Sequence, residues 1–505
     1  MKKKTVSLAM LSGLMLVFAF PRFDAGFLAW IALVPLLFAV RNESRGDAFR
    51  LGFLAGFIFN AGLLYWITYV VNHYGGLSRS FSAAVMLLLA AYLSLYPAFF
   101  ALGVVYFRRR GIPVLLSAPC LWTVLEFLRG LLFTGFPWEH LGYALHDQLH
   151  LIQIADITGV YGISFLIVFV NCLLFELLLG GSRRTAIVKA SVGLLVMVAV
   201  LSYGAWKTVS VDAALENAEK LNVSLIQGNI DQSVKWDPSY QRKTIKIYSD
   251  LSREASRIGV DCLVWPETAA PLFFQDMDDN HRTIRSVAQE TKATLLFGSP
   301  AYSIDNGVRS LMNTAWIVTP DGKVSGRYDK VRLVPFGEYV PLKRVLFFVD
   351  KLVAGFADFI PGDRVAPVNI DGLAAGVLIC YEGIFPEISR THVREGADFL
   401  VNITNDAWYG KTSAPYQHMS MIPFRAVENR RSLARAANTG ISAFVDPLGR
   451  VTAASNLFER EIVSGSLKIS TIDSFYTERG DLFVLLCFIV TTALFFCKRR
   501  KYDEH

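Results

Sequence analysis

Long apolar segments fill the first two fifths of this chain and constrain its fold more than any other feature. A bilayer core about 30 Å thick is spanned by about 20 helical residues. Most of the segments reach that length, although the first two are short enough to be tilted or partly interfacial. A mean hydropathy of +0.38 and a 53% share of hydrophobic residues agree with a membrane protein. The segments lie at about 5–20, 25–40, 51–71, 81–107, 112–134, 158–180, 185–206 and 482–497.

The first segment also resembles a secretory signal peptide, because the basic residues Lys2–Lys4 precede it. The sequence Phe18-Ala-Phe-Pro21 lacks the small residues of a cleavage site. We therefore expect this segment to be retained as the first transmembrane helix.

Basic and cation-poor loops alternate between the segments, and this alternation predicts the orientation of the chain. By the positive-inside rule, about eight helices span the membrane and both termini are cytoplasmic. Helices 1–7 would occupy 1–206, an extracytoplasmic domain 207–480, and helix 8 with a cytoplasmic tail 481–505. Lysine and arginine gather at 2–4, 41–50, 108–110, 183–184 and 498–501, whereas 21–24, 71–79 and 135–156 carry few of either.

Ionisable residues also occur in and beside the helical part. Glu126 and Arg129 sit one turn apart in the fifth segment, where lipid makes charge costly, so they either pair structurally or contact a lipid headgroup. The next loop holds His140, and His146-Asp-Gln-Leu-His150 differs by one residue from the zinc motif H-E-x-x-H. Asp in place of Glu, with no obvious third ligand, favours solvated or headgroup-facing histidines over a metal site.

The segment 207–480 has a different pattern, in which short β-rich runs alternate with helical stretches. This alternation favours an α/β layered domain over a sandwich or barrel made of strands alone. The net charge of +7 does not indicate nucleic-acid binding, because many of the cations flank the apolar segments. The six cysteines are scattered, which argues against a disulfide framework or metal-ligand spacing. Expected strands are 222–227, 262–265, 294–298, 314–318, 324–331, 375–380, 399–402 and 441–445, with helices at 238–258, 280–291, 385–395 and 417–436.

Cys380 stands where a short apolar run, 374–379, ends and Pro386 opens a helical pattern. A thiol at a strand-to-helix turn is expected to be partly exposed and close to helix amide dipoles, which favour thiolate. A lone cysteine is otherwise a buried core residue in most proteins. Two further polar motifs favour a functional cysteine over a core cysteine. They are Leu263-Val-Trp-Pro-Glu267 and the stretch from Gly326 through Lys330 to Glu338.

The three motifs, in this order on an α/β pattern, resemble the carbon–nitrogen hydrolase (nitrilase) superfamily over about 220–465. The resemblance implies a four-layered α-β-β-α sandwich with a catalytic Glu267–Lys330–Cys380 triad. Thiolate is the strong nucleophile and needs a base, for which Glu267 is the candidate, while Lys330 can stabilise an oxyanion. The resemblance further implies supporting roles for Glu338, Tyr381 and Glu382 and a substrate contact at Trp236.

With its membrane segments, the chain is similar to the membrane-bound, lipoprotein-modifying acyltransferases of this superfamily. That implies an acyl donor, chiefly phosphatidylethanolamine, and an acceptor, the α-amine of the diacylglyceryl-cysteine that begins an apolipoprotein. The acyl group would pass through a Cys380 thioester in a ping-pong reaction, without a cofactor or metal. The implied location is the inner membrane of a Gram-negative bacterium, with the catalytic domain in the periplasm.

Two apolar stretches near the motifs are expected to act as lids or lipid-dipping loops that shield a thioester from water. They are 269–274 and 345–356, and Phe347 and Phe348 of the second are expected to contact lipid. The alternatives are a membrane-tethered amidase or nitrilase that hydrolyses small amides, and a transporter or receptor with an inactive domain. Seven helices before the domain exceed what a tether needs, and an inactive domain would have lost one of the triad residues. A serine hydrolase is excluded because no G-x-S-x-G elbow occurs.

Overall fold

The computed structural model describes residues 2–305, 307–340 and 359–497, which form two compact units. The first unit comprises Met1–Thr68, Ser78–Val209 and Arg479–His505, and the second comprises Tyr69–Leu77 and Ser210–Glu478. The second therefore includes a short piece of chain from within the apolar region.

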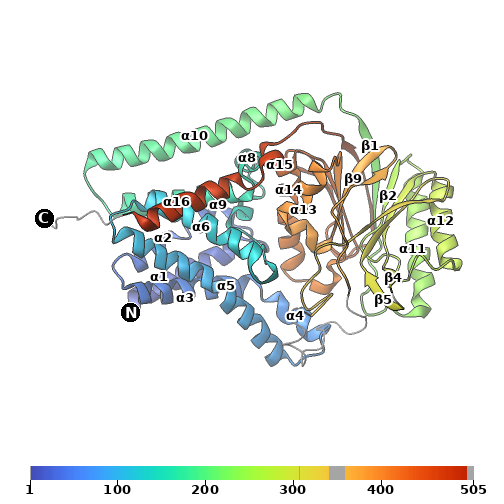
Figure 1. The fold of residues 1–505 in the computed structure, drawn as a ribbon, viewed down its shortest axis with the longest axis horizontal. Helices are drawn as coiled ribbons and strands as arrows, with labels where there is room; N and C mark the ends of the chain where they lie inside the picture. The colour runs from blue at the N-terminus through green and yellow to red at the C-terminus, as the bar shows by residue number, and fades with distance from the viewer. Residues whose placement is uncertain (1, 306, 341–358, 498–505) are drawn as a thin grey trace. The chain divides into compact units, whose positions relative to one another are not determined.

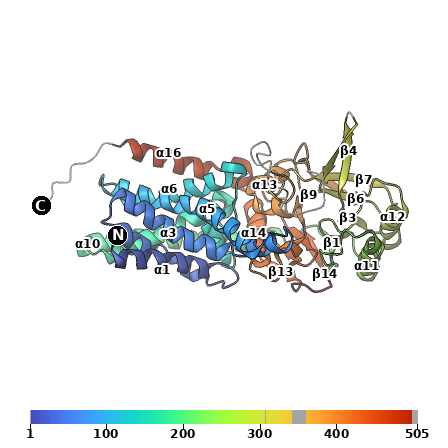
Figure 2. The ribbon, with the colours of Figure 1, turned by 90° about the horizontal axis from the view of Figure 1, so that it is seen from below.

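The first unit is helical throughout its described residues, and its helices α1, α3 and α5 lie side by side (Figures 1 and 2). Its elements are α1 (Lys3–Ala19), η1 (Gly26–Trp30), α2 (Val34–Val40), α3 (Arg45–Leu63), α4 (Trp66–His73, shared with the second unit), α5 (Arg79–Arg108), α6 (Val114–Leu131), η2 (Leu132–Thr134), η3 (Leu141–Leu145), α7 (Leu149–Ile152), α8 (Ala155–Thr158), α9 (Val160–Leu178), α10 (Arg183–Ala214) and α16 (Leu482–Phe496).

Four helices among the described residues are long and apolar enough to cross a bilayer. They are α5, α6 with its η2 extension, α9 and α10. The pair α3 and α4, bent by 53°, adds a fifth if it is one span, and 26–40 and α16 are shorter apolar helices. The helical membrane part is confirmed, and the eight-span topology stays a prediction.

The predicted second span, 25–40, is broken into a 3-10 turn and the short helix α2. The buried side chain of Asn171 in α9 supports this break, since its oxygen accepts a hydrogen bond from Leu33 N at 2.8 Å. Its amide donates to Ala29 O, also at 2.8 Å. An irregular backbone needs such partners away from water, which explains why this segment is not a single regular helix.

Glu126 and Arg129 both hold the loop that follows α6. Glu126 Oε1 accepts a hydrogen bond from Leu141 N at 2.7 Å, and Arg129 lies 2.8 Å from His140 Nδ1 and donates to Glu139 O at 3.2 Å. A cavity of about 20 Å³ beside them has room for about one water molecule. These contacts favour the structural interpretation over a lipid-headgroup site.

The loop histidines do not share one site. His146 lies 3.0 Å from Asp24, and His150 lies 3.3 Å from Thr208 Oγ1. His140 instead contacts Arg129.

The second unit contains two six-stranded mixed sheets, with strand orders β14-β1-β2-β3-β6-β7 and β13-β12-β11-β10-β9-β8. The runs β1-β2-β3 and β9-β10-β11 are parallel, and the outer strands join them antiparallel. The strands are β1 (Lys220–Gln227), β2 (Cys262–Val264), β3 (Thr294–Gly298), β6 (Thr314–Val318), β7 (Val324–Asp329), β8 (Val368–Ile370), β9 (Leu373–Ile379), β10 (Phe399–Thr404), β11 (Leu433–Ala437), β12 (Ala443–Val445), β13 (Val451–Ala454) and β14 (Glu461–Lys468), with a separate hairpin of β4 (Ala301–Asp305) and β5 (Val308–Met312).

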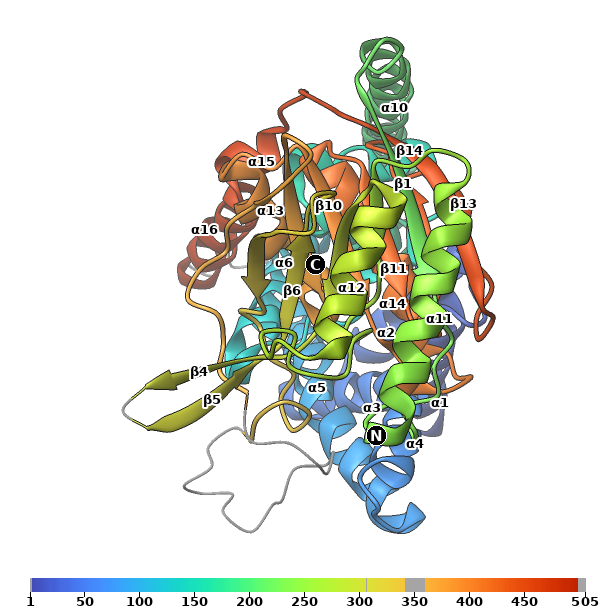
Figure 3. The ribbon, with the colours of Figure 1, turned by 90° about the vertical axis from the view of Figure 1, so that its right-hand side faces the viewer.

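Three hydrophobic clusters define four layers. The central cluster joins the two sheets, and it contains Leu225 and Val264 of the first sheet with Val377 and Val401 of the second. The outer clusters pack helices against the sheets: α11 (Pro238–Ser256) and α12 (Asp279–Thr291) on the first, and α13 (Pro386–Arg394) and α14 (Ala414–Asn429) on the second (Figure 3). The predicted α-β-β-α sandwich is confirmed.

One predicted helix, 417–436, is too long. Helix α14 ends at Asn429, Arg430 adopts a left-handed conformation with φ of 52°, and the chain continues as β11. Alanines at 434, 436 and 437 prolong a helical pattern, but every residue of β11 is buried between its neighbouring strands. Tertiary packing decides such alanine-rich runs more strongly than intrinsic propensity does.

Candidate active site

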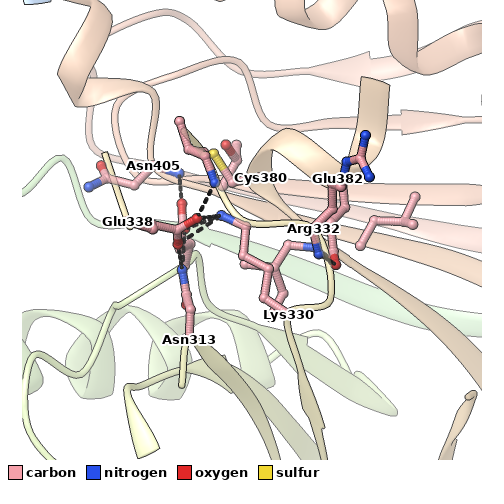
Figure 4. Close-up of polar contacts among 12 residues, drawn as sticks. Asn313, Lys330, Arg332, Glu338, Cys380, Glu382 and Asn405 are labelled. Carbon is pink, nitrogen blue, oxygen red and sulfur yellow. Dashed lines mark hydrogen bonds and ion pairs between the residues drawn. The ribbon is translucent and has the colours of Figure 1, made fainter. Parts of the chain in front are cut away.

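Glu267, Lys330 and Cys380 all lie just beyond the carboxyl ends of strands. Glu267 follows β2, Lys330 follows β7 and Cys380 follows β9, so the two sheets of the sandwich both contribute. The side chains converge in one buried site within the second unit, as Figure 4 shows for Lys330 and Cys380. The three residues that the sequence predicted to act together are therefore brought together.

Cys380 is buried, with 7% of its surface exposed, rather than partly exposed as expected. Its backbone has φ of 53°, the left-handed region that non-glycine residues rarely adopt. Burial raises the pKa of the Cys380 thiol above its ordinary value, and the nearby Glu267 carboxylate raises it further, while Lys330 opposes both. The resting site therefore holds a thiol, not a thiolate.

Lys330 is 1% exposed and contacts two carboxylates. Its Nζ atom lies 3.0 Å from Glu338 and 3.6 Å from Glu267 Oε1. Burial alone would lower the pKa of Lys330, but the Glu338 and Glu267 carboxylates raise it well above its ordinary value. Lys330 is thus a fixed positive charge, held in place mainly by Glu338.

Two asparagines that sequence reasoning missed orient Glu267. Asn313 Nδ2 donates to Glu267 Oε1 at 2.8 Å and also lies 2.8 Å from Glu338 Oε1, while Asn405 N donates to Glu267 Oε2 at 3.0 Å (Figure 4). Asn405 lies in a polar stretch just after an expected strand, and this position could have identified it as a candidate site residue. Asn313 directly precedes β6, and only the tertiary structure reveals its role.

Glu382 connects the Cys380 segment to the residues after Lys330. Its Oε2 accepts a hydrogen bond from Ile379 N at 2.7 Å, and its Oε1 accepts from Val331 N at 2.7 Å and Arg332 N at 3.1 Å. Burial raises the pKa of Glu382 to about 7, and these N–H groups counter that shift by stabilising the carboxylate. Its neighbour Tyr381 is buried and packs edge-on against Phe385.

Lys235 is a second buried lysine beside the site. Its Nζ donates to the backbone oxygen of Glu267 at 3.2 Å. Burial lowers the pKa of Lys235 to about 8, although the charge of Glu267 opposes the shift. The adjacent Trp236 is half-buried in the loop between β1 and α11.

One of the two predicted shielding stretches is part of the core. Ala269, Ala270, Leu272 and Phe274 belong to the cluster that packs the first sheet against α11 and α12. The expectation that 269–274 forms a lid or a lipid-dipping loop is therefore wrong, because these side chains are buried in the domain itself. The second stretch, with Phe347 and Phe348, lies outside the described residues.

The site combines a buried thiol, a fixed cation and an oriented carboxylate. A carboxylate next to a thiol can accept its proton as the sulfur attacks a carbonyl carbon, and a buried ammonium can stabilise the resulting oxyanion. Such a site is suited to acyl transfer by way of a thioester.

Sequence comparisons agree with this chemistry. The family description "Carbon-nitrogen hydrolase" matches residues 222–477, the stretch that forms the sandwich and holds the three side chains. Among solved structures, Nit3 of Saccharomyces cerevisiae, a member of branch 10 of the nitrilase superfamily, aligns at 19% identity over 56% of this chain and 97% of its own, with a TM-score of 0.39. Fold, site and family match together place the chain among the carbon–nitrogen hydrolases.

The helical unit matches a second family description, which narrows the family to which the whole chain belongs. The description "Apolipoprotein N-acyltransferase N-terminal domain" matches residues 12–173. The apolipoprotein N-acyltransferase of Geobacter metallireducens is 48% identical over 99% of this chain and 96% of its own length, and that of Haemophilus influenzae is 34% identical over 99% and 96%. The chain belongs to the apolipoprotein N-acyltransferase family, and is a multi-pass membrane acyltransferase of lipoprotein maturation.

The raised pKa of Cys380 gives a first prediction. The rate at which iodoacetamide alkylates Cys380 should be low at pH 7 and should climb without a plateau up to about pH 9, because only the thiolate reacts. The measurement is intact-protein mass against time at each pH, with Cys380→Ala as the control. A plateau below about pH 7 would mean that the resting site already holds a thiolate, contrary to the structure.

Proposed function

We propose that Cys380 carries the acyl group as a thioester, with Glu267 as the general base and acid and Lys330 as the oxyanion-stabilising cation. The Cys380 proton passes to Glu267 while the sulfur attacks the ester carbonyl of the donor. When the tetrahedral intermediate collapses, the C–O bond breaks and Glu267 returns the proton to the departing oxygen. The observation that supports this assignment most strongly is the buried Lys330–Glu267 contact of 3.6 Å beside the thiol.

The donor in this proposal is a membrane phospholipid, chiefly phosphatidylethanolamine, and the first product is a lysophospholipid. The acceptor is the α-amine of the diacylglyceryl-cysteine at the start of an apolipoprotein. Its nitrogen attacks the thioester, the C–S bond breaks, and Glu267 transfers a proton from the nitrogen to the Cys380 sulfur. The final product is a triacylated lipoprotein, and the relationship of the whole chain to the family supports this choice of substrates.

The remaining residues have supporting roles. Glu338 holds Lys330 in place, and Glu382 and Tyr381 shape the turn that carries the nucleophile. Trp236 would contact the substrate, as would Phe347 and Phe348. The distribution of basic residues supports an inner-membrane protein with both termini in the cytoplasm and the sandwich domain in the periplasm.

The test is the intact mass of the detergent-purified protein after incubation with phosphatidylethanolamine and no acceptor. A mass increase of one fatty acyl group is expected, and an amine-terminal lipopeptide should remove it, because a thioester reacts with amines. Cys380→Ala should show no increase. Cys262→Ala is the matched control, since Cys262 is also a buried cysteine of this unit but is not part of the triad.

Two other outcomes would contradict the proposal. An acyl group that persists in Cys380→Ala would mean that another residue is the nucleophile. No acyl-enzyme, together with hydrolysis of small amides, would favour a membrane-tethered amidase.

A further inference from the structure

A cluster of buried polar residues lies behind Cys380 and has no part in the mechanism above. Its members are Thr404 at the end of β10, Asp406 just after it, His418 in α14 and Arg435 in β11, and none is measurably exposed. Burying charged groups costs free energy unless they are closely paired. Such a cluster, which draws its members from β10, β11 and α14, therefore calls for an explanation.

The register of the second sheet brings Thr404 next to Cys380. Strands β9 and β10 are parallel, and Ile379, the last residue of β9, pairs with Ile403. Cys380 directly follows Ile379, and Thr404 directly follows Ile403 as the last residue of β10. Neighbouring strands lie about 4.8 Å apart, so the two residues are close in space at the edge of the sheet. The Thr404 side chain also lowers the pKa of the Cys380 thiol, in agreement with this proximity.

Asp406 holds the other side of the Thr404 hydroxyl. Thr404 Oγ1 donates to Asp406 Oδ1 at 3.0 Å, His418 Nδ1 lies 3.0 Å from the same oxygen, and Arg435 donates to Oδ2 at 2.8 Å. Burial raises the pKa of Asp406, but Arg435 and then His418 overcome it and lower that pKa to about 2. Asp406 is therefore a permanent carboxylate, and it keeps two partners if Thr404 turns away.

We propose that Thr404 is a catalytic hydroxyl that switches its single proton between Asp406 and the Cys380 sulfur. While Cys380 is a thiol or a thioester, the hydroxyl donates to Asp406. When Glu267 takes the thiol proton, the hydroxyl rotates and donates to the developing thiolate. Only a hydrogen bond changes, since the Thr404 proton never leaves its oxygen.

This arrangement would solve a problem that burial creates. Burial raises the pKa of Cys380, and a thiolate that forms without a nearby donor would be strongly disfavoured. Lys330 supplies a charge, but the mechanism also needs it for the oxyanion. The neutral Thr404 hydroxyl on β10 can stabilise the thiolate, so that Lys330 stays free to stabilise the oxyanion.

The inference rests on the proposed function, because it concerns the same Cys380 nucleophile. Its test, however, includes a step that requires no phospholipid. The variants are Thr404→Val, which removes the hydroxyl at nearly constant volume, and Thr404→Ser, which restores it. Thr294→Val is the matched control, because Thr294 is a buried threonine of β3 in the other sheet. Alkylation of Cys380 by iodoacetamide is followed from pH 7 to about 9.5, and acyl-enzyme formation from phosphatidylethanolamine is followed alongside.

A hydrogen bond to a charged group accounts for about ten- to hundredfold in an equilibrium. Thr404→Val should therefore alkylate at least about tenfold more slowly than the parent at each pH, and it should form the acyl-enzyme more slowly by a similar factor. Thr404→Ser should recover most of both rates, and Thr294→Val should match the parent.

Parental rates in Thr404→Val, or equal losses in Thr294→Val and Thr404→Val, would overturn the inference. If the parent protein forms no acyl-enzyme from phospholipid, the proposed function fails, yet the alkylation rates still decide whether Thr404 stabilises the thiolate.

Discussion

Lys330→Met is expected to reduce acyl-enzyme formation by about a thousandfold or more, because it removes the cation that we propose stabilises the developing oxyanion. It should also destabilise the domain by about 3–5 kcal/mol, since Glu267 and Glu338 would remain buried without their shared partner. The measurements are intact-protein mass after incubation with phosphatidylethanolamine and the free energy of unfolding in detergent. Retained acylation would contradict the role assigned to Lys330.

A double variant separates the two effects. Lys330→Met combined with Glu338→Gln removes one of the unpaired carboxylates, so it should recover part of the lost stability without recovering activity. Lys323→Met is the matched control, because Lys323 lies just before β7 and its ammonium pairs with the exposed Asp321. It should behave as the parent in both measurements.

Glu382→Gln is the second change with a large expected effect. Both carboxylate oxygens of Glu382 accept hydrogen bonds from backbone N–H groups. In Gln one of these oxygens becomes an NH₂ group, which cannot accept, so at least one buried N–H group loses its partner. The cost should be about 1–3 kcal/mol of folding free energy. Because Glu382 connects the end of β9 to the residues after Lys330, acyl-enzyme formation should also fall, by about a hundredfold.

Thermal unfolding and acyl-enzyme formation are the measurements for this variant. Glu395→Gln, in an exposed glutamate just after α13, provides the control and should resemble the parent. Normal acylation by Glu382→Gln would show that the connection is structural only.

The positions of Glu267 and Cys380 just beyond strands were predictable because each follows a short apolar run. The end of such a run predicts the end of a strand, and the polar residue just beyond it predicts a side chain at the sheet edge. Lys330 follows the largely polar strand β7, and only the resemblance of its motif to the nitrilase superfamily pointed to it. Asn313 could not be identified in either way, since its importance depends on Glu267 and Glu338 being close in space. The same holds for Thr404, which is significant only because β9 and β10 pair in one particular register.

The alternation of strands and helices predicted the layered domain but not all of its elements. Strands β8 and β13 are short edge strands, and β14 is another edge strand with alternating exposure, so none forms a long apolar run. The segment 269–274 is as apolar as a membrane-contacting loop would be, and hydropathy alone does not distinguish such a loop from core. Burial of Phe274 against the first sheet resolves that ambiguity.

The left-handed backbone of Cys380 has a consequence for protein engineering. A non-glycine residue in this region carries about 1 kcal/mol or more of conformational strain, whereas glycine adopts it freely. A redesign that optimises folding alone would therefore favour glycine at position 380 and eliminate the proposed nucleophile. At this position selection for reactivity and selection for thermal robustness oppose each other, and a stabilised version of the enzyme must gain its stability elsewhere.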